Sequence, residues 1–259
     1  VANTIVTSSA DIAADVSGSF RSGFNLKGSI SSMPLGAWST VNNMITGRSN
    51  HVQIGGENGA LVAGGAYGQA AVGDVNRYDG VAWSTSNPLP LSASYGEAAG
   101  DVGSELIFKG KWSGSSAQPE SSITMIGDGT TWSQGAYTNT DGMNSDYRVG
   151  GNIGTQNAAL STYRTELSSD RTEEYDGTSW IIHPYLNSIG VGHGKGGSVN
   201  AAFAVGGDTS PYFATELWDG VAWSAGNSQN VQIKGGAAGG SVNDGMTTGG
   251  RATGNFKNC

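Results

Sequence analysis

Four aspartates are the side chains with the most obvious chemical potential, because each stands directly before a glycine and four residues before a tryptophan. Repeated carboxylates can indicate metal sites, but each of these is more than 40 residues from the next. An aspartate in a tight turn commonly accepts hydrogen bonds from the backbone two residues further along. We therefore expect these side chains to cap turns and not to bind a metal. They are Asp79, Asp128, Asp176 and Asp219.

Histidine and cysteine give little support for catalysis or metal binding. His51, His183 and His193 lack a spacing that would place two of them on one metal, and ligand sets normally need three or four groups. Cys259 is the only cysteine, so an internal disulfide is excluded, and this residue is either a free thiol or a bridge to another chain. The sequence has no nucleophile elbow and no phosphate-binding loop. We expect no catalytic residue, no metal and no cofactor.

A sequence repeat predicts the secondary-structure elements that position the four aspartates. Its marker is a large residue, then Asp-Gly, two small residues and tryptophan, as in Tyr-Asp-Gly-Thr-Ser-Trp at residues 175–180. The marker tryptophans stand 43 to 49 residues apart, a period typical of solenoids and propellers. They are Trp38, Trp83, Trp132, Trp180 and Trp223.

Each repeat consists of four short β-prone segments, which are clearest in the last complete copy. A Gly-rich segment (192–198) is followed by an apolar one that ends in Gly-Gly (201–207), and then by 214–218 and 221–224 on either side of Asp219. Asp-Gly between two β-prone runs predicts a hairpin with a type I′ turn, so the last two segments should pair antiparallel. A repeated four-stranded antiparallel unit is a propeller blade, and its innermost strand has room only for small side chains.

The number of blades follows from the repeat length. A mean of about 46 residues predicts five blades in 259 residues, with six blades as the alternative. The last copy has only its first two segments (234–250) and the first copy only its last two (24–40). We expect these N- and C-terminal strands to pair and close the ring, because an unpaired edge invites aggregation. Residues 1–22 do not fit the repeat and are predicted to form an arm, and residues 23–259 the propeller.

Aromatic residues fill two predicted roles. The five marker tryptophans are expected to be the repeat core, since each buries about 150–250 Å². Other aromatic residues stand in the loops between the second and third segments, which share one face of a propeller. There they either stack on sugar rings or pack against the adjacent blade. These candidate ligand-binding residues are Tyr67, Trp112, Tyr163, Tyr212 and Phe213.

Composition excludes several classes of function. Thirteen Lys and Arg against 21 Asp and Glu give a net charge of −8, so a nucleic-acid partner is not expected. The chain has 43 glycines but only six prolines and no triplet period, which excludes collagen. It has no run of 18 apolar residues, so we expect no membrane insertion.

The repeat resembles the kelch-like propeller repeat, in which the second strand ends in Gly-Gly, the third carries a large residue and the fourth a tryptophan. More narrowly, residues 172–180 and 201–207 resemble the glycine-rich kelch-like repeats of virion proteins in tailed bacteriophages. The resemblance covers about residues 24–250. The third copy departs from the pattern, because Gly127 stands in the place of the large residue.

The resemblance implies a non-enzymatic structural or adhesive component of a virion, such as a tail fibre, a head fibre or a capsid decoration protein. It would be present in multiple copies in a larger assembly, contact other virion proteins through the arm, and contact host-surface glycans. The alternative is a free, secreted carbohydrate-binding lectin of propeller type, and an enzyme is a third hypothesis. Whether the protein purifies with a large particle distinguishes the first two.

Overall fold

The structure is a computed structural model that describes residues 40–68, 70–113, 122–139, 152–164, 170–187, 193–207, 213–230, 236–249, 251–252 and 255–256. The chain divides into two units, Val1–Val41 and Asn42–Cys259, and almost every described residue belongs to the second unit. The predicted arm, residues 1–22, lies outside the described residues. The elements in the described part of the chain are all strands. The described residues therefore include no helix that is long and apolar enough to cross a membrane.

Four sheets of four antiparallel strands, which we call blades 1 to 4, make up most of the second unit. Blade 1 consists of β1 (Val52–Gly56), β2 (Gly59–Ala63), β5 (Val75–Tyr78) and β6 (Trp83–Ser86). Blade 2 consists of β8 (Glu97–Asp101), β9 (Ser104–Phe108), β11 (Thr124–Gly127) and β12 (Trp132–Gln134). Blade 3 consists of β13 (Gly154–Thr155), β14 (Ala158–Arg164), β15 (Asp170–Tyr175) and β16 (Trp180–His183). Blade 4 consists of β17 (His193–Ser198), β18 (Ala201–Gly206), β19 (Thr215–Trp218) and β20 (Trp223–Ala225).

The remaining strands form four two-stranded sheets. These pairs are β3 (Ala66–Tyr67) with β4 (Ala70–Ala71), β7 (Ser92–Ser94) with β10 (Lys111–Ser113), β21 (Ala237–Gly239) with β22 (Met246–Thr248), and β23 (Arg251–Ala252) with β24 (Asn255–Phe256).

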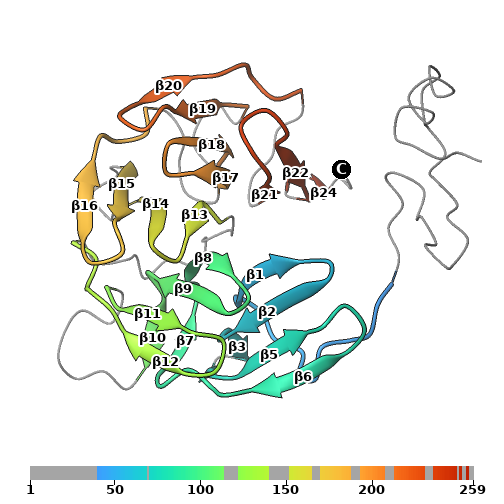
Figure 1. The fold of residues 1–259 in the computed structure, drawn as a ribbon. Helices are drawn as coiled ribbons and strands as arrows, with labels where there is room; N and C mark the ends of the chain where they lie inside the picture. Colours follow the sequence, from blue (N-terminus) through green and yellow to red (C-terminus); the bar gives the residue numbers. More distant parts are fainter. Residues whose placement is uncertain are drawn as a thin grey trace, which may run out of the picture. The chain divides into compact units, whose positions relative to one another are not determined.

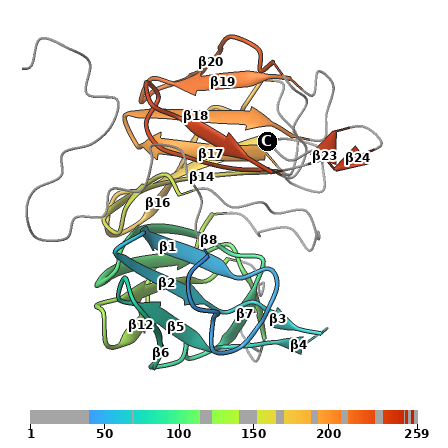
Figure 2. The same cartoon turned by 90° about the vertical axis from the view of Figure 1, so that its right-hand side faces the viewer.

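The blades follow one another around a common centre, with β1, β8, β13 and β17 innermost (Figure 1). Within each blade the strands lie in chain order from the centre outward, as blade 4 shows most clearly in Figure 2. This arrangement confirms the predicted all-β propeller of four-stranded antiparallel blades.

Glycine in the innermost strands permits close packing at the centre. A Cβ on Gly194 of β17 would lie 2.8 Å from the Cβ of Ala238, and one on Gly196 would lie 3.0 Å from the backbone oxygen of Gly240. The first contact is shorter than Cβ atoms tolerate and the second is tighter than most, so glycine at these two positions lets residues 238–240 pack closely against β17.

Large side chains fill the space between neighbouring blades. Between blades 2 and 3, Tyr175 and Trp180 pack on Leu106 and Phe108, and the rings of Phe108 and Trp180 are 4.8 Å apart. Between blades 3 and 4, Trp218 and Trp223 pack in one buried cluster with Ile153, Leu160, Leu186, Ala202, Ala204 and Ala214. These are the fully buried interfaces in which the repeat tryptophans contribute most.

The predicted number of blades and the predicted closure are not what the structure shows. It has four complete blades and the two-stranded β21–β22 sheet, so five blades, like the alternative of six, is wrong for the described chain. β21 and β22 are the first two segments of the last repeat. The two segments expected to complete it, residues 24–40, lie almost entirely outside the described residues. Among described strands, β21 and β22 pair only with each other.

The type of turn between the last two strands is also a correction. Tyr78 pairs with Trp83, so the loop has four residues and not two. A type I′ turn needs positive φ at both central residues. In this loop Gly80 alone has positive φ (91°), and the same holds for Gly129, Gly177 and Gly220 in the other blades.

Replacing a buried repeat tryptophan should destabilise the fold more than replacing a half-buried one. Trp180→Ala leaves a cavity between blades 2 and 3, and we expect the free energy of unfolding to fall by about 3–5 kcal/mol. Trp83→Ala is the matched control, because Trp83 is only half-buried and should cost clearly less. Urea denaturation of the full chain measures both. Equal losses for the two variants would contradict this account of the interfaces.

Candidate functional site

A cavity of about 510 Å³ lies among the innermost strands, and we call it the axial cavity. One wall comes from the start of β1 and of β8, the opposite wall from β21, and Asn152 contributes from the segment before β13. The polar side chains on the lining are Asn50, His51, Gln53, Tyr95, Glu97 and Asn152. This is a concave site with several polar groups, the kind that binds small molecules.

Two residues at the cavity have an unusual backbone conformation. Asn50 and Tyr95 have φ values of 55° and 60°, in the left-handed region that disfavours residues other than glycine. Each stands two residues before an innermost strand, and the Tyr95 amide donates a hydrogen bond of 2.9 Å to the Asn50 carbonyl. Strained residues of this kind cluster at ligand sites, where the surrounding fold holds them in place.

His51 contributes a neutral ring to the same wall. It is partly buried, and its Nδ1 is a buried atom with no hydrogen-bond partner within the described part of the chain. Burial lowers the pKa of His51, although a hydrogen bond with the Arg48 backbone opposes this shift. The imidazole is therefore uncharged at neutral pH and can exchange hydrogen bonds with a bound molecule.

Glu97 brings the only carboxylate among the lining residues, and the protein itself neutralises it. Its Oε1 is 2.7 Å from Lys195 Nζ on β17, and its Oε2 accepts a hydrogen bond of 2.9 Å from Ser161 Oγ on β14. Lys195 Nζ also donates to the Thr162 carbonyl at 3.3 Å. Blades 2, 3 and 4 thus contribute to one buried polar cluster beside the cavity. Because the Glu97 carboxylate is paired within this cluster, it does not present an unpaired charge to the cavity.

The opposite wall is small and uncharged. It consists of Ala237, Ala238, Gly239 and Gly240, from β21 and the residue after it. A ring with one apolar face could lie against this wall while its polar rim meets Asn50, His51 and Tyr95. The two walls are therefore chemically complementary to a ring of that kind.

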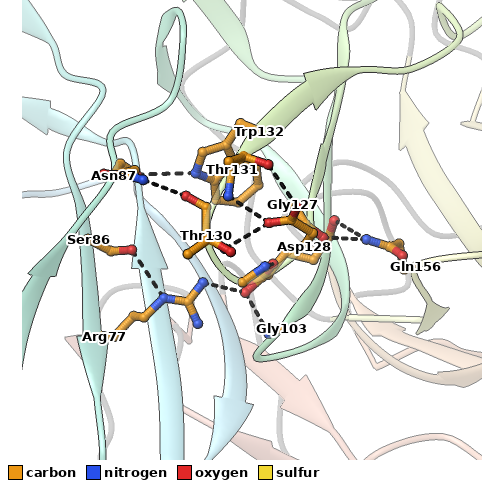
Figure 3. Close-up of polar contacts among 12 residues, drawn as sticks. Arg77, Ser86, Asn87, Gly103, Gly127, Asp128, Thr130, Thr131, Trp132 and Gln156 are labelled. Atoms are coloured by element: carbon orange, nitrogen blue, oxygen red, sulfur yellow. Dashed lines mark hydrogen bonds and ion pairs between the residues drawn. The ribbon is translucent and has the colours of Figure 1, made fainter.

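Two further ion pairs join neighbouring blades, and none of their residues lines the cavity. Arg77 of blade 1 contacts Glu105 of blade 2 at 2.7 Å, and Lys109 of blade 2 contacts Glu173 of blade 3 at 2.9 Å with both side chains fully buried. Figure 3 shows the contact between blades 1 and 2, where the Asn87 carbonyl accepts from Trp132 Nε1 at 3.2 Å. Among the described residues, no group of three or more His, Cys, Asp or Glu could hold a metal ion.

The four turn aspartates are placed as the sequence predicted. In blade 3, Asp176 Oδ1 accepts hydrogen bonds of 2.8 Å from the amides of both Thr178 and Ser179. Asp79, Asp128 and Asp219 accept the same pair of bonds in the other blades. These N–H donors hold the pKa of each carboxyl below its ordinary value.

The predicted ligand-binding aromatics do not gather at one place. Tyr67 is exposed, Phe213 is half-buried, and Trp112 is fully buried in the core of blades 1 and 2, where β10 pairs it with Ala93 of β7. The Tyr163 side chain and the whole of Tyr212 lie outside the described residues. Trp112 is therefore not available to a ligand on the surface.

The predicted core tryptophans differ in burial. Trp180 and Trp223 are buried, whereas Trp83 and Trp132 are half-buried. Trp38 lies outside the described residues.

Sequence reasoning missed two kinds of residue. Tyr137 and Tyr185 are exposed and each follows its marker tryptophan by five residues, a shared spacing that could have identified them. The cavity residues Asn50, His51 and Tyr95 carried no such signal, because nothing in their sequence neighbourhood distinguishes them from loop residues.

Comparison with known proteins bears on the fold. No protein-family model matches this sequence, and no curated protein matches it either. Among solved structures, one titled "Structure of YjhT" is similar, with a TM-score of 0.59 and 12% sequence identity over 82% of this chain and 75% of that chain. At this identity the similarity shows the fold alone, which in the described residues is a β-propeller of four-stranded antiparallel blades.

The turn aspartates should make the thermal stability of the protein depend on pH in the acidic range. Because the folded-state pKa of Asp176 lies below its ordinary 3.8, its contribution is present above that value and is lost as the pH falls through the lower, folded-state pKa. Asp176→Asn should therefore lower Tm at pH 7, and the difference from wild type should shrink towards pH 2. Thermal melts across this range measure it, and a constant difference would show that the carboxylate is not responsible.

Proposed function

We propose that this chain is a non-enzymatic β-propeller that binds a neutral carbohydrate in the axial cavity and serves as a component of a bacteriophage virion. The observation that carries the binding part is the cavity itself, with hydrogen-bonding side chains on one wall and alanine and glycine on the other. Sugars have both kinds of surface, since their hydroxyls need donors and acceptors and their C–H faces suit small apolar groups.

The charge balance of the cavity favours a neutral ligand over an ion. Glu97 is paired with Lys195, and burial keeps His51 uncharged at neutral pH. The remaining polar groups are amides and a phenol, which donate and accept hydrogen bonds without net charge. An anion or a cation would find no unpaired charge here and would lose its hydration, which is costly.

The contacts of the Glu97 carboxylate also favour a binding role over a catalytic one. Both of its carboxylate oxygens are engaged by Lys195 and Ser161, which is the arrangement of a structural carboxylate. A general acid or base must instead be free to exchange a proton with the substrate. We therefore propose recognition, without chemistry on the ligand.

The virion part of the proposal is supported by the repeat and by composition. The sequence resembles glycine-rich virion repeats, and its low content of charged residues, 13%, suits a displayed extracellular module. In this proposal residues 1–22 attach the propeller to other virion proteins, in many copies, and the cavity meets host-surface glycans. A free lectin would use the same cavity, so co-purification with phage particles decides between the two settings.

Binding can be tested without disturbing the backbone. Glycine accepts positive φ readily, so Tyr95→Gly and Asn50→Gly remove the side chains while relieving strain. Calorimetric titration of the full chain with glucose, galactose and N-acetylglucosamine should show binding of at least one sugar. We expect both variants to weaken it at least tenfold with an unchanged or raised Tm.

Two controls make the test specific. Tyr67→Ala removes an exposed aromatic residue outside the cavity and should leave binding unchanged. Glucuronate, an anionic sugar, should bind more weakly than glucose. No binding of any neutral sugar, or equal binding by wild type and both glycine variants, would refute the proposed site.

A further inference from the structure

The axial cavity is elongated along the strands that enclose it. Its lining follows β1 from Val52 to Gly55 and continues past the start of that strand to Asn50. The stretch on β1 alone is roughly 10 Å long, because a strand rises about 3.3 Å per residue. The volume of about 510 Å³ is that of a site for a drug-sized ligand, and a single sugar ring is smaller than such a ligand. The cavity therefore has room along its length for more than one sugar.

The β3–β4 hairpin stands at the end of the cavity where Asn50 lies. Ser49, the residue before Asn50, exchanges backbone hydrogen bonds of 3.0 and 2.7 Å with Ala66 of β3. A Cβ on Gly65 would lie 3.0 Å from the Cβ of His51, which lines the cavity. The base of the hairpin is therefore in contact with the backbone that carries Asn50 and His51.

Backbone contacts also fix the hairpin to the segment before β8. The Gly65 amide donates a hydrogen bond of 2.6 Å to the Ala93 carbonyl, and the Ala93 amide donates one of 3.1 Å to the carbonyl of Val72, which follows β4. Ala93 stands two residues before Tyr95 of the cavity lining. The hairpin projects from one side of blade 1 (Figure 2). Because it is anchored to both polar segments of the cavity wall, little ordering is needed when a ligand binds to it.

Tyr67 is the aromatic side chain that this hairpin exposes. Ala66 is buried, whereas 69% of the Tyr67 surface is exposed. Its partner in the register is Ala70, whose methyl group is too small to cover a phenol ring. Tyrosine offers a large amphipathic surface at a low cost in conformational entropy, since it has only two side-chain torsions. An exposed ring on a fixed hairpin suits the C–H face of a sugar.

The charged residue beside Ser49 is engaged within blade 1. The Arg48 guanidinium donates hydrogen bonds of 2.8 Å to the Asp74 carbonyl and 2.5 Å to Asn76 Oδ1. Arg48 therefore presents no unpaired charge to a ligand that leaves the cavity at this end. A neutral ligand is favoured here, as it is inside the cavity.

We propose that the ligand of this propeller is a neutral oligosaccharide, with one sugar unit in the axial cavity and a following unit stacked on Tyr67. Asn50, His51 and Tyr95 hold the first unit, and the β3–β4 hairpin presents the Tyr67 ring to the next part of the glycan. This inference rests on the proposed carbohydrate site and adds a minimum ligand length and a second contact. A monosaccharide does not reach Tyr67, so only longer ligands detect its role.

Calorimetric titration of the full chain with ligands of increasing length tests this inference. The two series are glucose, cellobiose and cellotriose, and N-acetylglucosamine, chitobiose and chitotriose. In the series that binds, we expect the trimer to bind about tenfold more tightly than the monomer. Tyr67→Ala should remove most of this gain and leave the affinity for the monomer unchanged. Tyr67→Phe should retain the gain, because stacking uses the ring and not the hydroxyl.

The control is Tyr137→Ala, which removes another exposed tyrosine that does not line the cavity and should change no affinity. Fluorine NMR with 3-fluorotyrosine supplies a second readout. The resonance absent from Tyr67→Phe is that of Tyr67, and the trimer should shift it while the monomer should not. Equal affinities for monomer and trimer, or a gain that survives Tyr67→Ala, would overturn this inference alone. Failure of every sugar to bind would refute the carbohydrate site and this inference with it.

Discussion

The indole of each repeat tryptophan is the contact on which the blade arrangement depends. In all four described blades it donates a hydrogen bond to a group that precedes the blade: Trp83 to Asn42, Trp132 to Asn87, Trp180 to Thr124 and Trp223 to Thr172. The first two bonds are exposed and go to a backbone carbonyl, whereas the last two are buried and go to a threonine hydroxyl. In blades 2 to 4 this hydrogen bond ties a blade to the preceding one, and in blade 1 it ties the blade to the segment at Asn42. Aromatic packing reinforces the bond where it is buried.

The tryptophan contacts lie away from the centre of the propeller, where the residues are smaller and more polar. Glycine and alanine bring the innermost strands together, and the cluster of Glu97, Lys195 and Ser161 joins three blades through satisfied charges. A buried charge is tolerated only with such partners, since an unpaired one is strongly destabilising. Beside the cluster, Asn50 and Tyr95 have left-handed φ values at the cavity, so the proposed binding residues are separate from the side chains that hold the blades together.

The sequence predicted the repeating unit well because tryptophan, Asp-Gly and Gly-Gly are local signals. The strands on either side of Asp176 and the backbone hydrogen bonds of that side chain are as expected. Predictions that depended on distant partners were wrong or incomplete. Trp112 was expected in a loop, either stacked on a sugar ring or packed against the adjacent blade, and the pairing of β10 with β7 buries it. The turn has four residues and not two, and the cavity could not be foreseen because left-handed φ at Asn50 and Tyr95 is imposed by tertiary structure.

The most direct test of the central claim is the exchange rate of the tryptophan indole protons with solvent, observed by ¹H–¹⁵N NMR of the full chain. Buried bonds to threonine should protect the indole protons of Trp180 and Trp223 strongly, because they open only when blades separate. The exposed bonds of Trp83 and Trp132 should exchange much faster. Uniformly fast exchange at all four positions would contradict the account, since the blades would then not be held by these contacts.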